Sequence, residues 1–389
     1  MENLIVMTNI IFDNSLQNDL IDDGNLRVDT LVNKDPSQIG GGKNRIQYID
    51  LAKGICITLV VLYHVFYNLH YLPPVIKTLS LFRMPLYFFL SGLFFKEYEG
   101  FFGFFLRKVN KLLIPFFFFY VVTSFAMPNI LLLFGHTVIH KESLGISGIW
   151  AFIAKEEFSN SPIWFLWALF LVNIYFYTIL VPIKKLTSNK NLIAMSITVI
   201  GFSIGFIGTA YLAVPPRINI LGFVDSAMSA LPFFVMGYLF NRFTEILVPN
   251  KWDKYLPIIV MLCFIITFYV GGNCSYKRNI YHITPILQYV CGMTGTLGVI
   301  FLAKILRNIP FLTYWGRYSI MILVSHALLL QIYIPIARKL LSDIPQIVMV
   351  IVIFIATMFS YQLLIPLMKK YIPYFTAQKN LIDVSKYTK

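Results

Sequence analysis

Long apolar runs recur along almost the whole chain and constrain its fold more than any other feature. Runs of about 18 residues or more alternate with short polar loops, and a bilayer core of about 30 Å needs such a run for each helix. Hydrophobic residues make up 58% of the 389 positions and charged residues only 13%, which excludes a water-soluble fold. The sequence therefore predicts an all-α, polytopic membrane protein.

The apolar runs predict about ten transmembrane helices. Their expected positions are residues 49–69, 78–96, 111–135, 162–183, 191–212, 219–240, 255–271, 283–305, 312–336 and 345–368. We expect residues 1–42, which mix polar and acidic residues, to form a flexible cytoplasmic tail. Residues 43–372 then form the transmembrane domain, and residues 373–389 form a C-terminal cytoplasmic tail.

Basic residues in short loops set the expected orientation, because such loops stay on the cytoplasmic side. They precede the first span and follow every second span, which predicts that both termini are cytoplasmic. Two expected outer loops, with Lys277 and Arg278 and with Arg338 and Lys339, oppose this orientation. The net charge of +14 comes mainly from basic loops beside apolar spans, so we expect no nucleic-acid partner. The four cysteines form no metal or disulfide pattern: Cys56, Cys263, Cys274 and Cys291.

The expected first helix contains three ionisable residues, Asp50, Lys53 and His64, in an otherwise apolar run. At about 100° per residue, Lys53 and His64 lie only about 20° apart around the axis, and Asp50 lies within about 60° of both. His64 lies about 16 Å deeper than Lys53. This face suits a path in which a cation binds a phosphate-bearing donor and an imidazole accepts a proton from a hydroxyl. The alternative is structural: Asp50 pairs with Lys53, and His64 bonds a neighbouring helix.

The expected second helix combines Arg83, Pro85 and the pair Ser91-Gly92 with bulky aromatic residues. Arg83 is expected toward the outer side at a depth similar to His64. There it can stabilise an oxyanion or bind an acidic sugar, and snorkelling to the interface is the alternative.

Further polar and aromatic residues are candidates for contact with substrates. Arg217 and Asp225, together with Asn219, lie around the expected outer start of the sixth span, where solvation of a loop also explains them. Trp164 can stack on a sugar or on the acyl donor, although aromatic belts are common. His326 lies in an apolar helix, where a hydrogen bond to a neighbouring helix is the favoured alternative.

The chain resembles the acyltransferase 3 family of bacterial multi-pass membrane acyltransferases over about residues 45–370. Lys53 and His64 meet the spacing of a basic residue, ten residues and a histidine. The branch that acetylates sugars, with fucose acetylase-like members, is the most similar. Further matching motifs are Tyr48 to Gly54, Met84-Pro85, Phe88 to Gly92, Phe105 to Lys108, Lys111, Ile114-Pro115, Pro162 to Leu166, Ala230 to Phe234, Gly237, Tyr314 to Ser319 and His326.

The resemblance implies transfer of an acyl group, usually acetyl from acetyl-CoA, to a hydroxyl of a cell-surface polysaccharide or its lipid-linked precursor. It implies a bacterial cytoplasmic (inner) membrane location, no permanently bound cofactor and no metal. Its partners are then acyl-CoA, the glycan or lipid-linked sugar and membrane lipids, and a homo-oligomer stays open. The expected site residues are His64, Asp50 and Arg83 for catalysis, Lys53, Arg107, Lys111 and Trp164 for the donor, and Ser91, Arg217, Asp225 and His326 for the acceptor.

Two residues depart from the family pattern. Lys53 stands where many members have arginine, and Arg83 stands where a histidine is expected before Met-Pro. The mechanism is either direct transfer with His64 as general base or a covalent acyl intermediate on His64 or Ser91. The rival functions are a transporter or flippase of a lipid-linked sugar, and a non-catalytic sensor or assembly partner.

Overall fold

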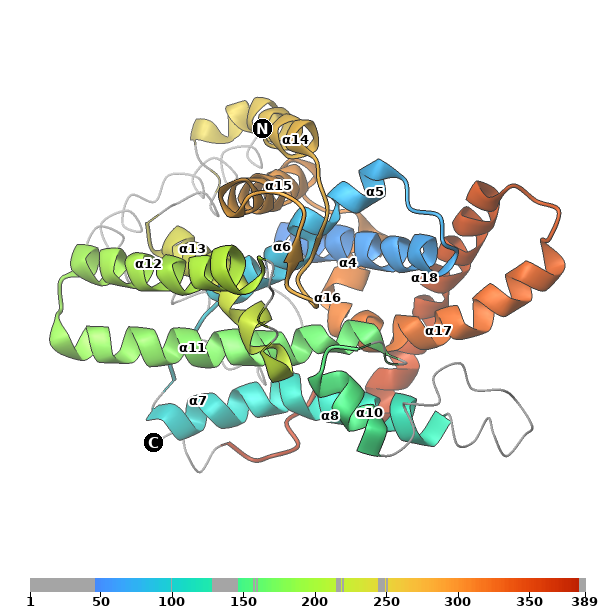
Figure 1. Cartoon of the computed structure of the whole chain (residues 1–389), viewed down its shortest axis with the longest axis horizontal. Helices are drawn as coiled ribbons and strands as arrows, with labels where there is room; N and C mark the ends of the chain where they lie inside the picture. Colours follow the sequence, from blue (N-terminus) through green and yellow to red (C-terminus); the bar gives the residue numbers. More distant parts are fainter. Residues whose placement is uncertain are drawn as a thin grey trace, which may run out of the picture.

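The computed structural model describes residues 46–98, 100–127, 146–156, 158, 160–214, 218, 220–243, 249 and 251–384 (Figure 1). The expected N-terminal tail, residues 1–42, lies outside these described residues. The described chain is almost entirely helical and has one two-residue antiparallel pair, β1 (Cys274–Ser275) with β2 (Ile280–Tyr281). This confirms the all-α, polytopic fold class.

Nine helices of the described chain are long and apolar enough to cross a membrane. They are Gln47–Asn68, Gly100–Ala126, Ser161–Leu186, Lys190–Leu212, Leu221–Arg242, Lys251–Val270, Pro285–Leu306, Ser319–Leu340 and Gln346–Tyr371. Two of them include π-helical segments: Gly100–Ala126 contains Val109–Leu113 (η1) and Val122–Ala126 (η2), and Lys190–Leu212 contains Ile207–Leu212 (η5). The helices named below are α4 (Gln47–Asn68), α7 (Gly100–Lys108), α8 (Ile114–Val121), α11 (Trp164–Leu186), α12 (Lys190–Phe206), α13 (Val224–Phe243), α14 (Leu256–Val270), α15 (Pro285–Leu306), α17 (Ser319–Leu340) and α18 (Gln346–Tyr371).

Two expected spans differ from the observed helices. The second, at 78–96, contains the shorter helix α6 (Ser80–Leu93), which follows the single turn of α5 (Pro74–Thr78). Most of the side chains of α6 are buried, so protein rather than lipid surrounds it. The expected span at 312–336 is divided at Tyr318 into α16 (Pro310–Arg317) and α17.

Close approaches at glycine hold the inner helices together. A β-carbon on Gly92 of α6 would lie 1.9 Å from the Phe234 carbonyl oxygen of α13, and one on Gly237 of α13 would lie 2.0 Å from that of Phe89. Contacts between backbones are the usual way for membrane helices to pack tightly. The sequence Phe89 to Gly92 therefore fixes α6 against α13.

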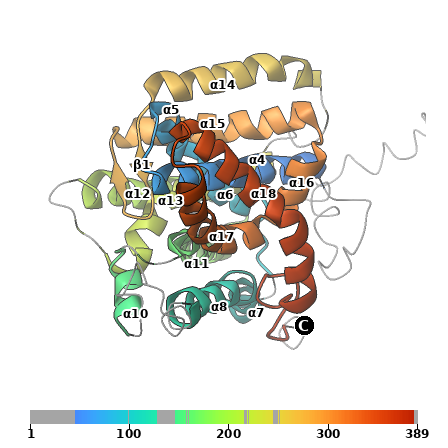
Figure 2. The same ribbon diagram turned by 90° about the vertical axis from the view of Figure 1, so that its right-hand side faces the viewer.

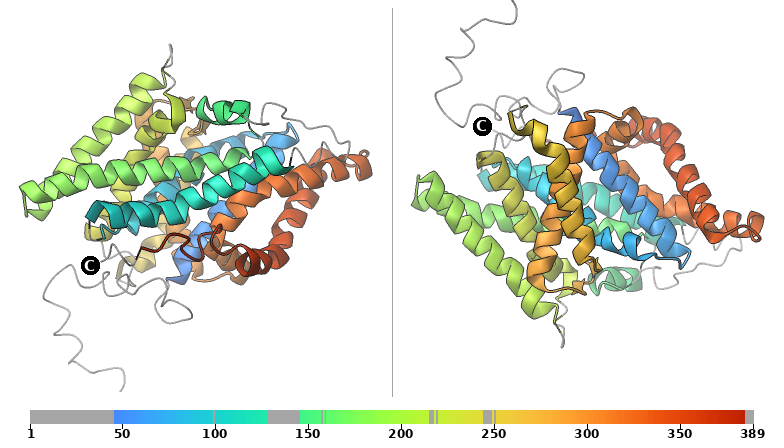
Figure 3. Two further views of the ribbon diagram at one scale, coloured as in Figure 1. Left: turned by 90° about the horizontal axis from the view of Figure 1, so that it is seen from below. Right: turned by 90° about the horizontal axis from the view of Figure 1, so that it is seen from above.

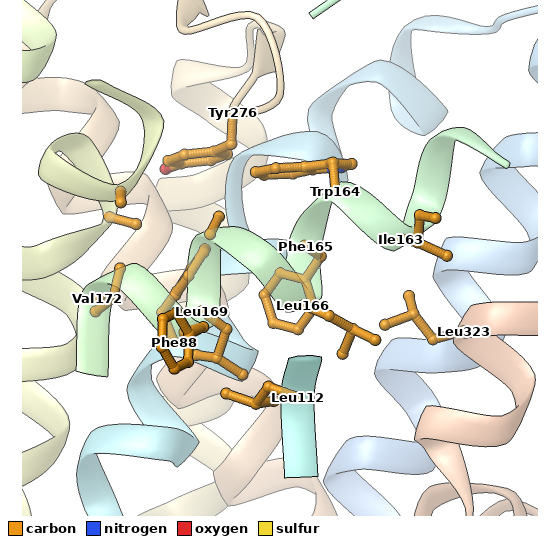
Figure 4. Close-up of a cluster of buried hydrophobic side chains, with 14 of the residues drawn as sticks. Phe88, Leu112, Ile163, Trp164, Phe165, Leu166, Leu169, Val172, Tyr276 and Leu323 are labelled. Carbon is orange, nitrogen blue, oxygen red and sulfur yellow. The ribbon is translucent and has the colours of Figure 1, made fainter. Parts of the chain in front are cut away.

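Aromatic and aliphatic side chains fill the space between α6, α11 and α17. Phe88 of α6 and Phe165 of α11 meet edge to face with centroids 5.1 Å apart, and Leu323 of α17 belongs to the same cluster (Figure 4). Helices α12, α14 and α18 have most of their residues outside the buried interior. Figures 2 and 3 show α14 on one face of the bundle and α7 and α8 on the opposite face.

The chain returns to α7 and η1 after α18. The Asn110 amide nitrogen donates to the Ile382 carbonyl oxygen at 3.0 Å, and its amide oxygen accepts from the backbone nitrogens of Leu381 and Ile382. The Phe375 ring stacks on that of Phe118 with centroids 4.1 Å apart. Much of the stretch predicted as a C-terminal tail thus packs on the domain, and its exposure to the cytoplasm stays a prediction.

Candidate functional site

Two histidines from distant parts of the sequence meet inside the bundle. His64 on α4 and His326 on α17 have ring centroids 5.1 Å apart. His326 is fully buried, and its Nδ1 lies 2.9 Å from the Ile322 carbonyl oxygen. Because a carbonyl only accepts, Nδ1 bears the hydrogen in this contact and the Nε2 lone pair of the neutral ring is available. Nε2 is buried and has no hydrogen-bond partner within the described structure, whereas His64 is half-buried.

Arg83 brings a positive charge next to this pair. Its side chain on α6 is buried, and its guanidinium carbon lies 3.7 Å from the centroid of the Tyr63 ring. Its Nε and Nη1 have no hydrogen-bond partner among the described residues. A buried charge with unused donors is costly, which favours a site that receives electron-rich oxygen atoms from a substrate. Arg83 also interacts electrostatically with His64, and the similar depth of the two residues in the membrane stays a prediction.

A second cation, Lys277, interacts electrostatically with His64 from the loop between α14 and α15. Its Nζ donates to the Glu156 carbonyl oxygen at 3.1 Å and lies 4.5 Å from the centroid of the Phe158 ring. Sequence reasoning treated Lys277 only as a loop charge that opposed the expected orientation. The one sequence signal for a role of Lys277 was its positive charge in a loop that was expected to face outward.

Asp225 lies in a buried ion pair rather than in a solvated loop. Lys155 Nζ donates to Asp225 Oδ1, and Asp225 Oδ1 also accepts from the backbone nitrogen of Ser226 at 2.9 Å. Burial lowers the pKa of Lys155, and the ion pair with Asp225 opposes that shift. A cavity of about 230 Å³ is lined by this pair together with Arg278 and Asn279. Arg217 and Asn219 lie outside the described residues.

The other end of α4 holds the residues expected near the donor. Because α4 is unbroken, the angular relation between Lys53 and His64 holds. Asp50 is buried, and Arg317 Nε lies 3.8 Å from its Oδ2. Lys53 Nζ lies 5.7 Å from the centroid of the Phe94 ring, and the Lys53 carbonyl oxygen accepts from the Tyr87 hydroxyl at 3.1 Å. Arg317 is a partner of Asp50 that sequence reasoning did not assign.

Arg107 and Lys111 follow on the helix that runs from α7 into η1. The guanidinium carbon of Arg107 lies 4.5 Å from the centroid of the Tyr98 ring. Its Nε is buried without a hydrogen-bond partner in the described part of the chain. Lys111 Nζ donates to the Ala377 carbonyl oxygen at 2.9 Å. Of the two cations, Arg107 thus keeps a buried donor unused while Lys111 binds the returning chain.

Ser91 and Trp164 are both bound by protein neighbours. Ser91 Oγ accepts from Asn173 Nδ2 at 3.4 Å. Trp164 is buried at the start of α11 and belongs to the aromatic cluster of Figure 4, with its ring centroid 5.8 Å from that of Phe223. Trp164 therefore does not lie exposed in an aromatic belt at the membrane interface. Its role toward the acyl donor stays a prediction.

The described residues contain no group of three or more His, Cys, Asp or Glu side chains placed to hold a metal ion. What they do contain is a half-buried imidazole beside a second imidazole, with two cations, Arg83 and Lys277, that interact with the first imidazole electrostatically. Such an arrangement can accept a proton and stabilise a negative charge that develops nearby.

The chain matches a known protein family. The model of the acyltransferase 3 family, described as an acyltransferase domain, matches residues 46–365. No curated protein and no solved structure matches the chain. The matched residues include both histidines, Arg83 and the donor-side cations.

Proposed function

Because the chain belongs to the acyltransferase 3 family, we propose that this membrane acyltransferase moves an acetyl group from acetyl-CoA to a hydroxyl of a cell-surface polysaccharide or of its lipid-linked precursor. The observation that carries this proposal is the contact between His64 and His326 beside the unused donors of Arg83. A base and a positive charge in one buried region are the two elements that acyl transfer to a hydroxyl needs.

In the proposed reaction His64 acts as general base. Its neutral ring accepts the proton of the acceptor hydroxyl while the hydroxyl oxygen forms a bond to the thioester carbonyl carbon. The carbonyl oxygen of the resulting tetrahedral intermediate bears the negative charge, which Arg83 and Lys277 stabilise. The carbon–sulfur bond then breaks, and the CoA thiolate takes the proton back from His64. No proton is gained or lost by the enzyme.

His326 is proposed to position His64 and the acceptor. Its Nδ1 is fixed by the Ile322 carbonyl, so its Nε2 faces its surroundings as an acceptor. That nitrogen can accept from a ring N–H of His64 or from the acceptor hydroxyl. Asp225 lines a separate cavity with Lys155 and is proposed to contact the acceptor there.

The donor is proposed to enter at the Lys53 end of α4. Eleven residues of unbroken helix separate Lys53 from His64, which corresponds to about 16 Å. A donor whose phosphates bind near Lys53 and Arg107 therefore needs an extended arm to present its thioester at His64. Acetyl-CoA has this form. Basic loops near these residues support a cytoplasmic entrance. The location proposed from the family resemblance is the cytoplasmic membrane of a bacterium.

The decisive experiment measures transfer of label from radiolabelled acetyl-CoA into glycan and lipid-linked glycan. Membranes with wild-type protein are compared with His64→Ala, His64→Gln and the exposed control His70→Ala at matched abundance. Loss of general base catalysis lowers the rate about 100-fold or more. We expect this loss for both His64 variants and none for His70→Ala.

Two other results would contradict the proposal. Equal labelling by wild type and His64→Ala would show that His64 is not the base. No labelling by any membrane, together with movement of a glycan across the bilayer, would show a transporter. Acid quenching during turnover separates direct transfer from an acyl-enzyme, because only the latter leaves label on the protein.

A further inference from the structure

A cavity of about 370 Å³ lies where α11, α12 and α13 come together. Three exposed cations line it, one from each helix: Lys184, Lys190 and Arg242. The hydroxyl residues Thr187 and Ser188 of the connecting turn lie beside them. None of these residues takes part in the acyl transfer proposed above.

The remaining wall of the cavity is largely apolar. Ile193, Ala194 and Ile197 of α12 and Leu239 of α13 form it, and Ile197 is fully buried. These positions continue along the helices away from the cations. A ligand that fits both parts has an anionic head and a hydrocarbon body.

The position of the cavity relative to the bilayer follows from its helices. Ser161–Leu186 and Lys190–Leu212 are both long and apolar enough to cross a membrane, and only residues 187–189 connect them. The turn must therefore lie at the membrane surface, which is the level of lipid headgroups. Figure 1 shows α11 and α12 as neighbouring helices joined by this turn.

The charges of the cavity favour an anion. Lys184 forms an ion pair with Glu97, the guanidinium carbon of Arg242 lies 5.2 Å from the centroid of the Tyr238 ring, and Lys190 adds a third positive charge. The backbone N–H groups of Asn191 and Leu192 at the start of α12 do not bind the anion, because both already donate to the Asn189 side chain. Side chains rather than the helix end thus provide the attraction. Lysine and arginine both bind phosphate through charge-assisted hydrogen bonds.

We propose that this cavity binds an anionic membrane phospholipid, with its phosphate at Lys190 and Arg242 and an acyl chain along Ile193, Ile197 and Leu239. Basic pockets between transmembrane helices at the membrane surface bind lipid headgroups in this way. The phosphates of acyl-CoA have the same chemistry as the phosphate of a lipid headgroup and fit the same cations. The apolar wall and the headgroup level favour the lipid, and the experiment separates the two.

The test titrates phosphatidylglycerol onto the purified full chain in phosphatidylcholine nanodiscs and counts bound lipid by native mass spectrometry. The variant Lys190→Gln/Arg242→Gln is compared with Lys185→Gln/Arg307→Gln, which removes one lysine and one arginine that do not line the cavity. Each charge near a membrane surface contributes about fivefold to binding. We expect about 30-fold weaker binding for the first variant and wild-type binding for the second.

A second variant and a second measurement keep the proposal falsifiable. Ala194→Trp fills the apolar part without a change of charge and is expected to displace the lipid. Undiminished lipid binding by either cavity variant, or an equal loss in the control, overturns the proposal. The KM for acetyl-CoA in uncharged lipid is expected to stay unchanged in Lys190→Gln/Arg242→Gln. A raised KM with unchanged lipid binding would instead identify a donor site.

Discussion

Gly54 of α4 and Gly316 of α16 face each other so closely that neither position has room for a β-carbon. A β-carbon on Gly54 would lie 1.8 Å from the Leu312 carbonyl oxygen, and one on Gly316 would lie 1.8 Å from that of Asp50. Arg317 follows directly and reaches Asp50. The crossing of two backbones therefore sets the environment of the Lys53 end of α4.

We predict that Gly54→Ala and Gly316→Ala each lower the melting temperature of the detergent-solubilised protein. Overpacking costs about 1–3 kcal/mol, and a backbone carbonyl cannot move aside as a side chain can. Gly298→Ala is the control, because its nearest neighbours are side-chain atoms at 3.2 and 3.3 Å. Equal melting temperatures for all three variants would show that the crossing tolerates a methyl group.

We predict that Lys53→Gln raises the KM for acetyl-CoA about tenfold or more, since a charge-assisted hydrogen bond contributes about 1.5–3 kcal/mol. Arg107→Gln is expected to act in the same direction, whereas Lys53→Arg preserves donor binding. Initial rates at varied acetyl-CoA concentration provide the measurement. Lys77→Gln removes an exposed charge from α5 and serves as the control. A fall in kcat at constant KM would place Lys53 outside the donor site.

We predict that removal of either partner of the buried ion pair between Lys155 and Asp225, without the other, destabilises the protein. Lys155→Met leaves an uncompensated buried carboxylate and is expected to destabilise the fold by about 3–5 kcal/mol. The double variant Lys155→Met/Asp225→Leu is expected to recover most of that loss. Thermal unfolding of the wild type, of Lys155→Met, of Asp225→Leu and of the double variant completes the double-mutant cycle. A stable but inactive double variant would support contact with the acceptor, and additive losses would argue against coupling.

We predict that Cys274 does not react with a maleimide in the folded protein between pH 7 and 9. Burial raises the pKa of its thiol to about 12, so the reactive thiolate stays scarce well above the pH at which an ordinary cysteine ionises. Its Sγ also donates to the Ser80 carbonyl oxygen at 3.1 Å. A gel-shift assay with and without denaturant measures the reaction, and Ser188→Cys provides an exposed control. Labelling that rises with pH as in the control would contradict a buried, protonated thiol.

The long apolar runs were sufficient to predict the fold class, because hydrocarbon thickness fixes how many residues a helix needs. The same argument misplaced the helix boundaries where protein replaces lipid. Helix α6 is surrounded by other helices and does not need the full length of a span. The expected span at 312–336 also took in the less apolar residues of α16, whose Gly316 packs on α4, whereas the helix that can cross the membrane begins only at Ser319.

The site was predictable within one helix and less so between helices. The shared face of Lys53 and His64 follows from helix geometry alone. The contacts of His326 with His64 and of Lys155 with Asp225 join residues that are far apart in sequence, and they depend on packing that no local pattern encodes. Arg317 at the end of α16 and Lys277 in the loop between α14 and α15 likewise interact with residues that are distant in the sequence, Asp50 and His64.

The return of residues 372–384 to η1 has a consequence for how the protein is made. Asn110 and Lys111 find their backbone partners at Ala377, Leu381 and Ile382, about 270 residues later. During synthesis, the helix that bears Arg107 therefore lies in the membrane without these hydrogen-bond partners of Asn110 and Lys111 until α18 and the residues that follow it have left the ribosome. These contacts therefore form only after the synthesis of α18, and chaperones or lipid headgroups have access to Asn110 and Lys111 until then.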